Sequence, residues 1–267
     1  MNEKIWIQNE WDTLNVVFLG NIKDYQGNKD YIQGKNIVKD IKHILENYNI
    51  QVLSPYYNKN IKIRQSFWVR DSATVIDDKL LLFPLLKPVR RNEYKTYKNI
   101  SKNVMLLMPP VNTNKIEGGD ILQHNNTIFV GLGNRTNQSG IIWLKKIFYY
   151  KTIISIKHTA LHLDCCFCLL PNDKIVYSKK YINNLPNYCF EKYECVNIDN
   201  MIDGESNLAT NLFFINKNTL LMSDNIKFKN FMQYLQDEGF VVLTITLDSI
   251  FKGKGGIRCI IQPLLRQ

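Results

Sequence analysis

The chain has 267 residues, of which 45% are hydrophobic and 22% charged, enough for one large domain with a substantial core. Residues 1–11 lack the apolar stretch of a signal peptide, and no run reaches the roughly 20 apolar residues of a membrane-spanning helix. Six cysteines are too few and too clustered for a disulfide scaffold, so we expect a soluble, reduced, cytoplasmic protein.

The net charge of +10 is the one outlier of the composition, and such a charge suits a nucleic-acid or anionic-surface partner. The lysines are scattered through a sequence rich in Lys, Asn and Ile, however, so neither a nucleic-acid nor a membrane partner is expected. Arginine is scarce, and the positions that keep it are candidates for bidentate binding. These positions are Arg64, Arg70, Arg90, Arg91, Arg135, Arg258 and Arg266.

Taken in order, the first half of the chain predicts a strand, an amphipathic helix and two hairpins, each hairpin followed by a helix and a strand. The elements are strand 13–20, helix 36–48, strand 50–53, hairpin 67–76 with 79–84, helix 93–100, strand 104–108, hairpin 120–124 with 127–131, helix 139–149 and strand 152–156. The second half repeats the pattern. It comprises hairpin 161–170 with 174–177, a weakly helical stretch 181–188, strand 193–198, hairpin 211–215 with 219–223, helix 227–237, strand 241–245 and a last strand 255–265.

This hairpin–helix–strand unit recurs at intervals of roughly 45 to 50 residues, a period that indicates a repeat architecture. The last strand has no hairpin partner behind it, and the first strand has none either. Pairing these two strands closes a ring of five units, with the two ends of the chain in one sheet. We therefore expect residues 1–267 to form a single α/β domain.

The segment 115–140 is the most informative stretch of the sequence. Glu117 precedes a pair of glycines, which give the backbone unusual freedom and let another group approach closely. A hairpin that turns at Asn125 and Asn126 follows, and Arg135 lies where the chain leaves it. The sequence predicts that this hairpin presents a carboxylate and a guanidinium close together.

Polar residues recur where each unit begins. They are Asp71, Glu117 with Asp120, His162 with Asp164, the stretch 207–211 that ends in Asn211, and Cys259. In a closed ring these points converge on the axis, so a cysteine, an imidazole and several carboxylates are expected in one pocket. His162 and Asp164 are two residues apart on a predicted strand and would share a face. His162 and Cys259 each have a structural interpretation as well, since a lone histidine on a strand or a lone cysteine near a C-terminus is more often part of a core.

The clustered cysteines at 165, 166 and 168 do not have zinc-site spacing, so no metal is expected. The ordered motifs, taken together, resemble the guanidino-group-modifying (pentein) superfamily. That superfamily comprises the arginine deiminases, dimethylarginine dimethylaminohydrolases and amidinotransferases. The motifs are residues 68–71 (WVRD), 117–120 (EGGD), 162–164 (HLD) and 255–259 (GGIRC). The resemblance covers nearly the whole chain and implies a five-bladed α/β propeller.

The resemblance also implies roles for individual residues. Cys259 resembles the nucleophile, His162 the general acid and base, and Glu117 the carboxylate that orients the histidine. Asp71 and Asp164 resemble the pair that grips the guanidinium of the substrate.

Arg135, with Arg90 or Arg91, resembles the clamps on a substrate carboxylate, and Asp120 is a further candidate for substrate binding. No metal or organic cofactor is implied. The expected partner is a small guanidino compound, and a homodimer is left open.

The subfamily signals are mixed. The GLGNRTN segment at 131–137 and the short chain resemble the dimethylargininases, whereas Asp164 resembles the deiminases and amidinotransferases. The NEWD segment at 9–12 resembles the amidinotransferases, but EGGD at 117–120 is the hydrolase-like form. A guanidine-cleaving hydrolase is the favoured interpretation and an amidinotransferase its nearest rival. A non-catalytic propeller used as a binding module, which the charge would suit, has no need of the Cys–His–Glu set.

Overall fold

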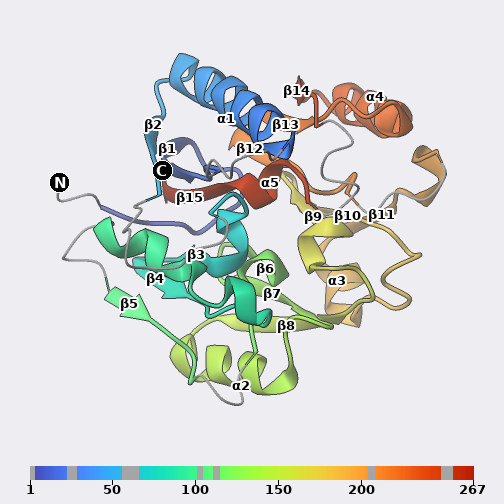
Figure 1. Cartoon of the computed structure of the whole chain (residues 1–267). Helices are drawn as coiled ribbons and strands as arrows, with labels where there is room; N and C mark the ends of the chain where they lie inside the picture. The colour runs from blue at the N-terminus through green and yellow to red at the C-terminus, as the bar shows by residue number, and fades with distance from the viewer. Residues whose placement is uncertain are drawn as a thin grey trace.

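Five three-stranded sheets follow one another around a common centre (Figure 1). The computed structural model describes residues 4–22, 29–55, 66–100, 105–110, 115–203, 208–247 and 255–267. In this part of the chain no helix is both long and apolar enough to cross a membrane. The expected five-bladed α/β propeller is confirmed.

The sheets take their strands largely in chain order, and only the first sheet joins the two ends of the chain. They are β15 (Ile261–Arg266), β1 (Leu14–Leu19) and β2 (Gln51–Leu53); β3 (Ala73–Ile76), β4 (Lys79–Leu82) and β5 (Met105–Leu107); β6 (Ile121–His124), β7 (Thr127–Leu132) and β8 (Thr152–Lys157); β9 (Phe167–Leu170), β10 (Lys174–Tyr177) and β11 (Glu194–Asn197); and β12 (Phe213–Asn216), β13 (Thr219–Ser223) and β14 (Val241–Ile245).

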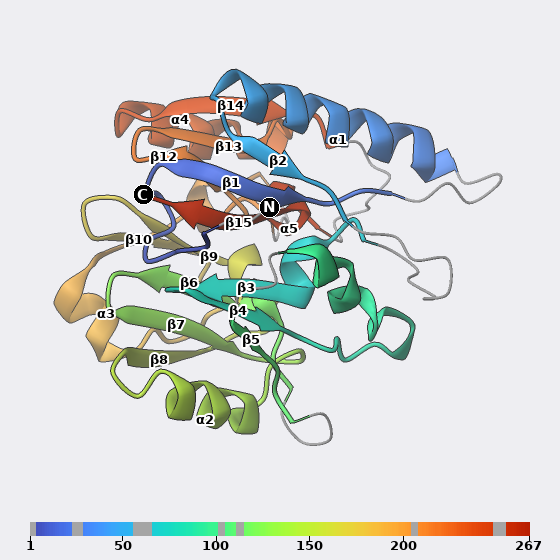
Figure 2. The ribbon, with the colours of Figure 1, turned by 90° about the vertical axis from the view of Figure 1, so that its left-hand side faces the viewer.

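Every sheet has the same pairing rule. The middle strand runs antiparallel to the first strand of its hairpin and parallel to the strand that returns after the connecting segment. In the first sheet β15 takes the place of the missing hairpin strand, with Leu19 opposite Ile261. The predicted ring closure by the two chain ends is therefore correct, and Figure 2 shows β1 and β15 side by side.

Helices cover the outer strands (Figure 2). They are α1 (Lys29–Asn47), α2 (Gln138–Ile147), α3 (Asn187–Lys192) and α4 (Lys229–Asp237), while α5 (Ile257–Ile260) lies at the centre. The helix α1 packs on β2, α3 on β11 and α4 on β14, and α2 inserts Ile141 and Leu144 into the core beside β7. The predicted amphipathic stripes thus face the sheets.

Short helical turns precede four of the inner strands, where the sequence predicted strand, except at residues 118 and 119, for which it predicted a glycine turn. The turns are η1 (Val69–Ser72), η4 (Gly118–Asp120), η5 (Leu163–Cys165) and α5, each directly before or one residue before the inner strand of its sheet. Backbone bonds close them, as from Asp120 N to Glu117 O at 3.1 Å and from Cys259 N to Gly256 O at 3.2 Å. His162 and Asp164 therefore do not share a strand face. The prediction failed because every residue of these turns is buried, polar and apolar alike, so the sequence pattern does not separate a strand from a helical turn there.

Other element bounds also differ from the prediction. The segment 93–100 is a 3₁₀ helix, η3 (Glu93–Asn99), and α3 begins at Asn187, near the end of the helical stretch expected at 181–188. Short 3₁₀ turns η2 (Pro88–Arg90), η6 (Asp199–Met201) and η7 (Ile226–Phe228) complete the elements. Arg64, Val104 and Asn207 lie outside the described residues.

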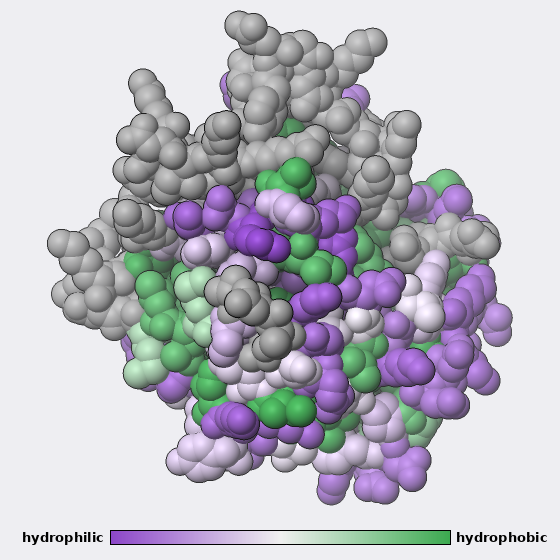
Figure 3. All heavy atoms as spheres, turned by 60° about the horizontal axis from the view of Figure 1, so that its bottom comes forward, coloured by the Kyte–Doolittle hydropathy of each residue, from purple (hydrophilic) through white to green (hydrophobic). Residues whose placement is uncertain are grey.

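Apolar residues of the sheets and helices form four buried clusters around the ring. The face seen in Figure 3 carries hydrophilic side chains with hydrophobic ones scattered between them. Exposed large apolar residues include Met105 and Leu106 on the edge strand β5. The interior of the ring, in contrast, contains many buried charges, and these build the site.

Candidate active site

The starts of the five inner strands place one reactive or polar side chain each at the centre of the ring. Asp71 lies in η1, Glu117 precedes η4, His162 precedes η5, Asn211 precedes β12 and Cys259 lies in α5. All five side chains are buried. Residues distant in sequence therefore converge as expected, because the repeat brings the same point of each unit to the axis.

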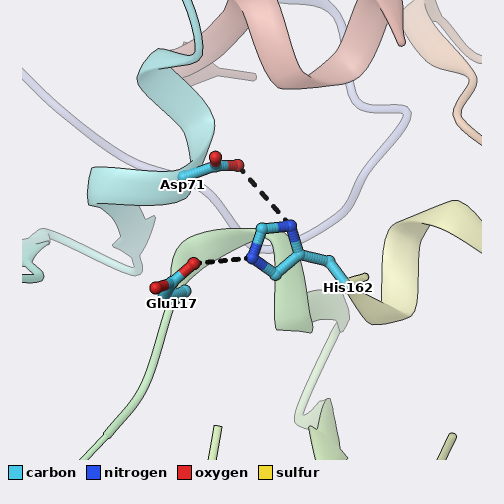
Figure 4. A group of neighbouring side chains, drawn as sticks. All are labelled: Asp71, Glu117 and His162. Carbon is cyan, nitrogen blue, oxygen red and sulfur yellow. Dashed lines mark hydrogen bonds and ion pairs between the residues drawn. The ribbon is translucent and has the colours of Figure 1, made fainter. Parts of the chain in front are cut away.

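His162 lies between two carboxylates (Figure 4). Its Nε2 is 2.8 Å from Glu117 Oε2, a hydrogen bond, and its Nδ1 is 3.7 Å from Asp71 Oδ1, too long for one. Burial alone would lower the pKa of His162, but the charges of Asp71 and Glu117 outweigh it and raise that pKa to about 10. The imidazole is therefore held in its protonated form, ready to donate a proton.

Asp71, Glu117 and His162 also lie close enough to share a cation, with one ligand atom from each within 4.8 Å of the others. A histidine binds a metal through a neutral ring nitrogen. The raised pKa of His162 disfavours that form. The cluster is better suited to proton transfer than to metal ligation.

Glu117 is fixed from several sides. Its Oε1 accepts a hydrogen bond from Leu86 N at 3.0 Å, and Arg135 Nη1 lies 3.4 Å from both of its oxygens. Burial opposes its charge, but the bond to His162 and the nearby cations lower the pKa of Glu117. The predicted pairing of a carboxylate and a guanidinium by this hairpin is confirmed.

Cys259 is 4% exposed, and its thiol lies against Asn211. Asn211 Nδ2 donates to Cys259 Sγ at 3.5 Å, and Asn211 Oδ1 accepts from Arg258 N at 2.9 Å. Burial, followed by the charges of Asp164 and Asp71, raises the pKa of Cys259 well above its usual value. Without a cation between those carboxylates the thiol stays protonated.

Asp164 is buried on the same side as the thiol, in η5. Its Oδ1 accepts from Cys165 Sγ at 3.5 Å, and its Oδ2 lies 3.6 Å from Arg258 Nε. Burial raises the pKa of Asp164 to about 6, although His162 and Arg258 oppose the shift. The carboxylate is therefore mainly charged at neutral pH.

The two predicted glycine pairs are places of close approach. A Cβ on Gly118 would lie 2.1 Å from Arg70 O, and one on Gly119 would lie 2.8 Å from the His162 ring. A Cβ on Gly255 would meet the Trp68 ring at 2.4 Å, and one on Gly256 would meet Asn211 Oδ1 at 2.3 Å. Both pairs let the side chains and backbone of the site approach more closely than any other residue permits.

Gly119→Ala is expected to displace the His162 ring and to lower kcat about tenfold or more, because a misplaced proton donor loses its alignment. Gly34→Ala is the matched control. Its Cβ would meet the side chain of Ile22, with Cδ1 nearest at 3.1 Å, and alanine favours a helix. Steady-state rates and thermal melting of both variants check the prediction, and a fully active Gly119→Ala protein would contradict it.

Arg90 does not present a free guanidinium to the site. It donates to both oxygens of Glu93, and its Nη1 donates to Asp71 Oδ2 at 2.8 Å. The prediction that Arg90 binds a substrate carboxylate is therefore corrected. Arg90 instead holds Asp71 in place. Arg91 is exposed.

The prediction that Asp120 binds the substrate is also corrected. Its side chain is fully buried, and both carboxylate oxygens already accept hydrogen bonds from the protein. Oδ2 accepts from Thr136 Oγ1 at 2.6 Å, and Oδ1 accepts from Leu163 N at 2.8 Å and lies 3.1 Å from His158 Nε2. Asp120 thus ties the Arg135 turn to the backbone that follows His162. Its oxygens are therefore taken up by contacts within the protein.

Sequence reasoning assigned no role to Asn211, Arg258 or Glu10, all of which lie in or against the site. Asn211 lies at the same position of its repeat unit as Asp71 and Glu117, so the repeat period was the sequence signal for its place in the site. Arg258 belongs to the few retained arginines. Glu10 lies in the NEWD segment, but its pairing with Arg258 gave no signal, because the two residues are 248 positions apart.

A family model described as arginine deiminase matches residues 63–212, more than half of the chain. The uncharacterized protein YkgA of Bacillus subtilis is 27% identical over 205 residues, which cover 76% of this chain and 70% of that protein. An arginine deiminase of Staphylococcus haemolyticus is 27% identical over 198 residues, 57% of this chain and 48% of the relative. The match thus spans about half the length of that deiminase.

Solved structures with the same fold include the inosamine-phosphate amidinotransferase StrB1 of Streptomyces griseus, with a TM-score of 0.85, 14% identity and coverage of 98% of this chain and 97% of that one. The dimethylarginine dimethylaminohydrolase of Pseudomonas aeruginosa has a TM-score of 0.77 and 15% identity, with coverage of 94% and 100%. The chain therefore belongs to the arginine deiminase family, within the pentein superfamily of guanidino-group-modifying enzymes.

Proposed function

We propose that the protein is a hydrolase that cleaves the guanidino group of arginine or of an arginine-like compound through a covalent intermediate on Cys259. The supporting observation is a set of buried polar atoms without hydrogen-bond partners among the described residues. They are Asp71 Oδ1, Asp164 Oδ2 and His162 Nδ1. Buried carboxylate oxygens without donors are costly, so they are suited to a ligand that brings several N–H groups.

A guanidinium meets that requirement because it is planar, cationic and rich in donors. Two carboxylates hold such a cation through charge-assisted bonds and fix its carbon against a nucleophile. Asp71 and Asp164 both act electrostatically on Cys259 and raise its pKa. A bound cation offsets these charges, so the substrate itself favours the thiolate.

The thiolate of Cys259 attacks the guanidinium carbon and forms a C–S bond. His162 transfers its proton to the departing nitrogen, which leaves as ammonia or an amine and produces a thiouronium. His162, now neutral, takes a proton from an incoming water, whose oxygen attacks the same carbon. The C–S bond breaks and releases a urea-type product, which is citrulline if the substrate is arginine. Glu117 orients His162 throughout, through the 2.8 Å hydrogen bond.

An amidinotransferase is the second candidate, because the same thiouronium can be resolved by an amine. The NEWD segment favours it, and its Glu10 is buried against Arg258, next to Cys259. The EGGD turn resembles the corresponding motif of the hydrolases, and so favours water as the group that resolves the thiouronium. Dimethylarginine hydrolysis and non-catalytic binding are less well supported, because Asp164 and the Cys–His–Glu set, respectively, argue against them.

The test is product analysis by mass spectrometry for a panel of arginine, agmatine and dimethylarginine, each with and without glycine or another amine. A hydrolase releases ammonia and a urea-type product without an added amine. Turnover of arginine that depends on the amine would replace the hydrolase assignment with the transferase. No turnover of any guanidino compound would reject both enzyme assignments.

The pH dependence of kcat/KM is expected to be bell-shaped. Asp164 must be charged to hold the cation, so activity falls below its pKa of about 6. His162 must be protonated to donate to the leaving nitrogen, so activity falls above its pKa of about 10. Initial rates between pH 5 and 11 check both limbs, and a profile that is flat through pH 6 would contradict the role given to Asp164.

A further inference from the structure

Arg258, the residue directly before Cys259, lies buried between two carboxylates. Its Nη2 donates to Glu10 Oε2 at 2.7 Å, and its Nε lies 3.6 Å from Asp164 Oδ2. The side chains of Glu10 and Arg258 are 3% and 4% exposed. One guanidinium thus connects the N-terminal segment of the chain with the carboxylate beside the thiol.

Glu10 is itself held in place. Its Oε1 accepts a hydrogen bond from Gln123 N at 3.0 Å and lies 3.9 Å from Arg70 Nη2. Arg70 in turn donates to Gln262 Oε1 and Ile121 O. Glu10 therefore has fixed contacts with the neighbouring sheets and can act as an anchor for Arg258.

We propose that Glu10 and Arg258 form a positioning pair that keeps the carboxylate of Asp164 charged and directed toward the guanidino group. The proposal rests on the proposed function, since it takes a guanidinium as the ligand of Asp164. It adds the N-terminal segment to the determinants of substrate binding. It also gives the residue before the nucleophile a role of its own.

The geometry between Arg258 and Asp164 supports a positioning role. At 3.6 Å the contact is an ion pair without a hydrogen bond, and both Arg258 Nε and Asp164 Oδ2 lack such a partner among the described residues. Arg258 thus stabilises the negative charge without occupying the oxygen. Asp164 Oδ2 stays available to accept an N–H from the substrate.

The charge balance around Asp164 supports the same role. The charged or titratable groups that act on Asp164, or on which it acts, are His162, Cys165 and Cys166 around its own turn, Arg70 and Asp71 on η1, Arg258 and Cys259 on α5, and Cys168 on β9. Burial and Asp71 favour the neutral form of Asp164, whereas His162, Arg258 and Arg70 favour the charged form. His162 is needed for proton transfer, and Arg258 is the arginine whose guanidinium lies within ion-pair distance of Asp164, at 3.6 Å from Oδ2, among the described residues.

The test compares Arg258→Met, Arg258→Lys and the double variant Glu10→Gln/Arg258→Met. Loss of the cation is expected to move the acid limb of kcat/KM upward by about one pH unit, or about tenfold in kcat/KM at a fixed pH on that limb. The change should appear mainly in KM. Arg258→Lys should restore part of the shift, because it keeps the charge.

The double variant separates positioning from structural support. Arg258→Met alone leaves Glu10 buried without its partner, which destabilises the fold, whereas removing both charges is far better tolerated. We expect the double variant to recover thermal stability but to keep the shifted acid limb. A stable double variant with the acid limb of the wild type would overturn the proposal.

Lys151→Met is a matched control. Lys151 forms a buried ion pair with Asp77 at 2.8 Å, at the hairpin end of β3, opposite to the end that carries Asp71. Its loss should lower the melting temperature without moving the acid limb. An equal shift in this variant would show that loss of stability, and not Arg258, moves the limb.

A measurement without turnover keeps this proposal distinct from the proposed function. NMR titration of ¹³C-labelled aspartate carboxylates, assigned with Asp164→Asn, reports the ionisation of Asp164 directly. The Asp164 signal should titrate about one pH unit higher in the double variant than in the wild type. If the Asp164 signal does not move, the positioning role of Glu10 and Arg258 is overturned. If the wild type cleaves no guanidino compound, only the proposed enzymatic function is overturned.

Discussion

Cys259→Ser is expected to reduce turnover by at least about a thousandfold while the protein stays folded, because a serine hydroxyl is a far weaker nucleophile than a thiolate. The substitution keeps the size of the side chain and leaves Asn211 with an oxygen to donate to. Binding of arginine should therefore survive. Steady-state rates, thermal melting and calorimetric binding of arginine together check this result.

The covalent step has its own readout. Mixing the wild type with substrate and quenching with acid should trap an adduct whose mass maps to Cys259. Cys195→Ser is the control, since Cys195 lies on the outer strand β11 and should keep full activity. A Cys259→Ser protein that retains most of its rate would show that the reaction does not pass through this thiol.

The second large effect concerns substrate choice. If Asp71 Oδ1 and Asp164 Oδ2 both bind terminal guanidino nitrogens, a dimethylated nitrogen has lost the donors that one of them needs. A buried carboxylate left unpaired costs roughly 2–5 kcal/mol. Arginine or another unsubstituted guanidine should therefore be preferred over dimethylarginine by on the order of a hundredfold or more in kcat/KM.

Shortening the carboxylate tests the cause of this preference. Asp164→Gly removes the group that rejects a methylated nitrogen, so the gap between the two substrates should narrow. Asp164→Asn keeps the shape but removes the charge, and should weaken binding of both substrates. A wild type that prefers dimethylarginine would show that Asp164 does not contact the guanidinium.

The sequence by itself determined the ring. Its repeated hairpin–helix–strand pattern, with one unpaired strand at each end, required the first and last strands to pair, and β1 and β15 do so. This inference works because strand and helix periodicities are local properties of the chain. The convergence of Asp71, Glu117, His162 and Cys259 followed from the same repeat, since equivalent points of a closed ring meet at its centre.

Only the tertiary structure decided how those residues are held. The helical turns before the inner strands depend on contacts between units that no local pattern encodes, as between Gly119 and the His162 ring. The expected clamp Arg90 is paired with Asp71, and the oxygens of Asp120 are taken up by contacts within the protein. The anchor of Arg258 is Glu10, 248 positions away in the sequence. The partner of a buried charge is chosen by where the fold removes water, and that depends on the packed ring as a whole.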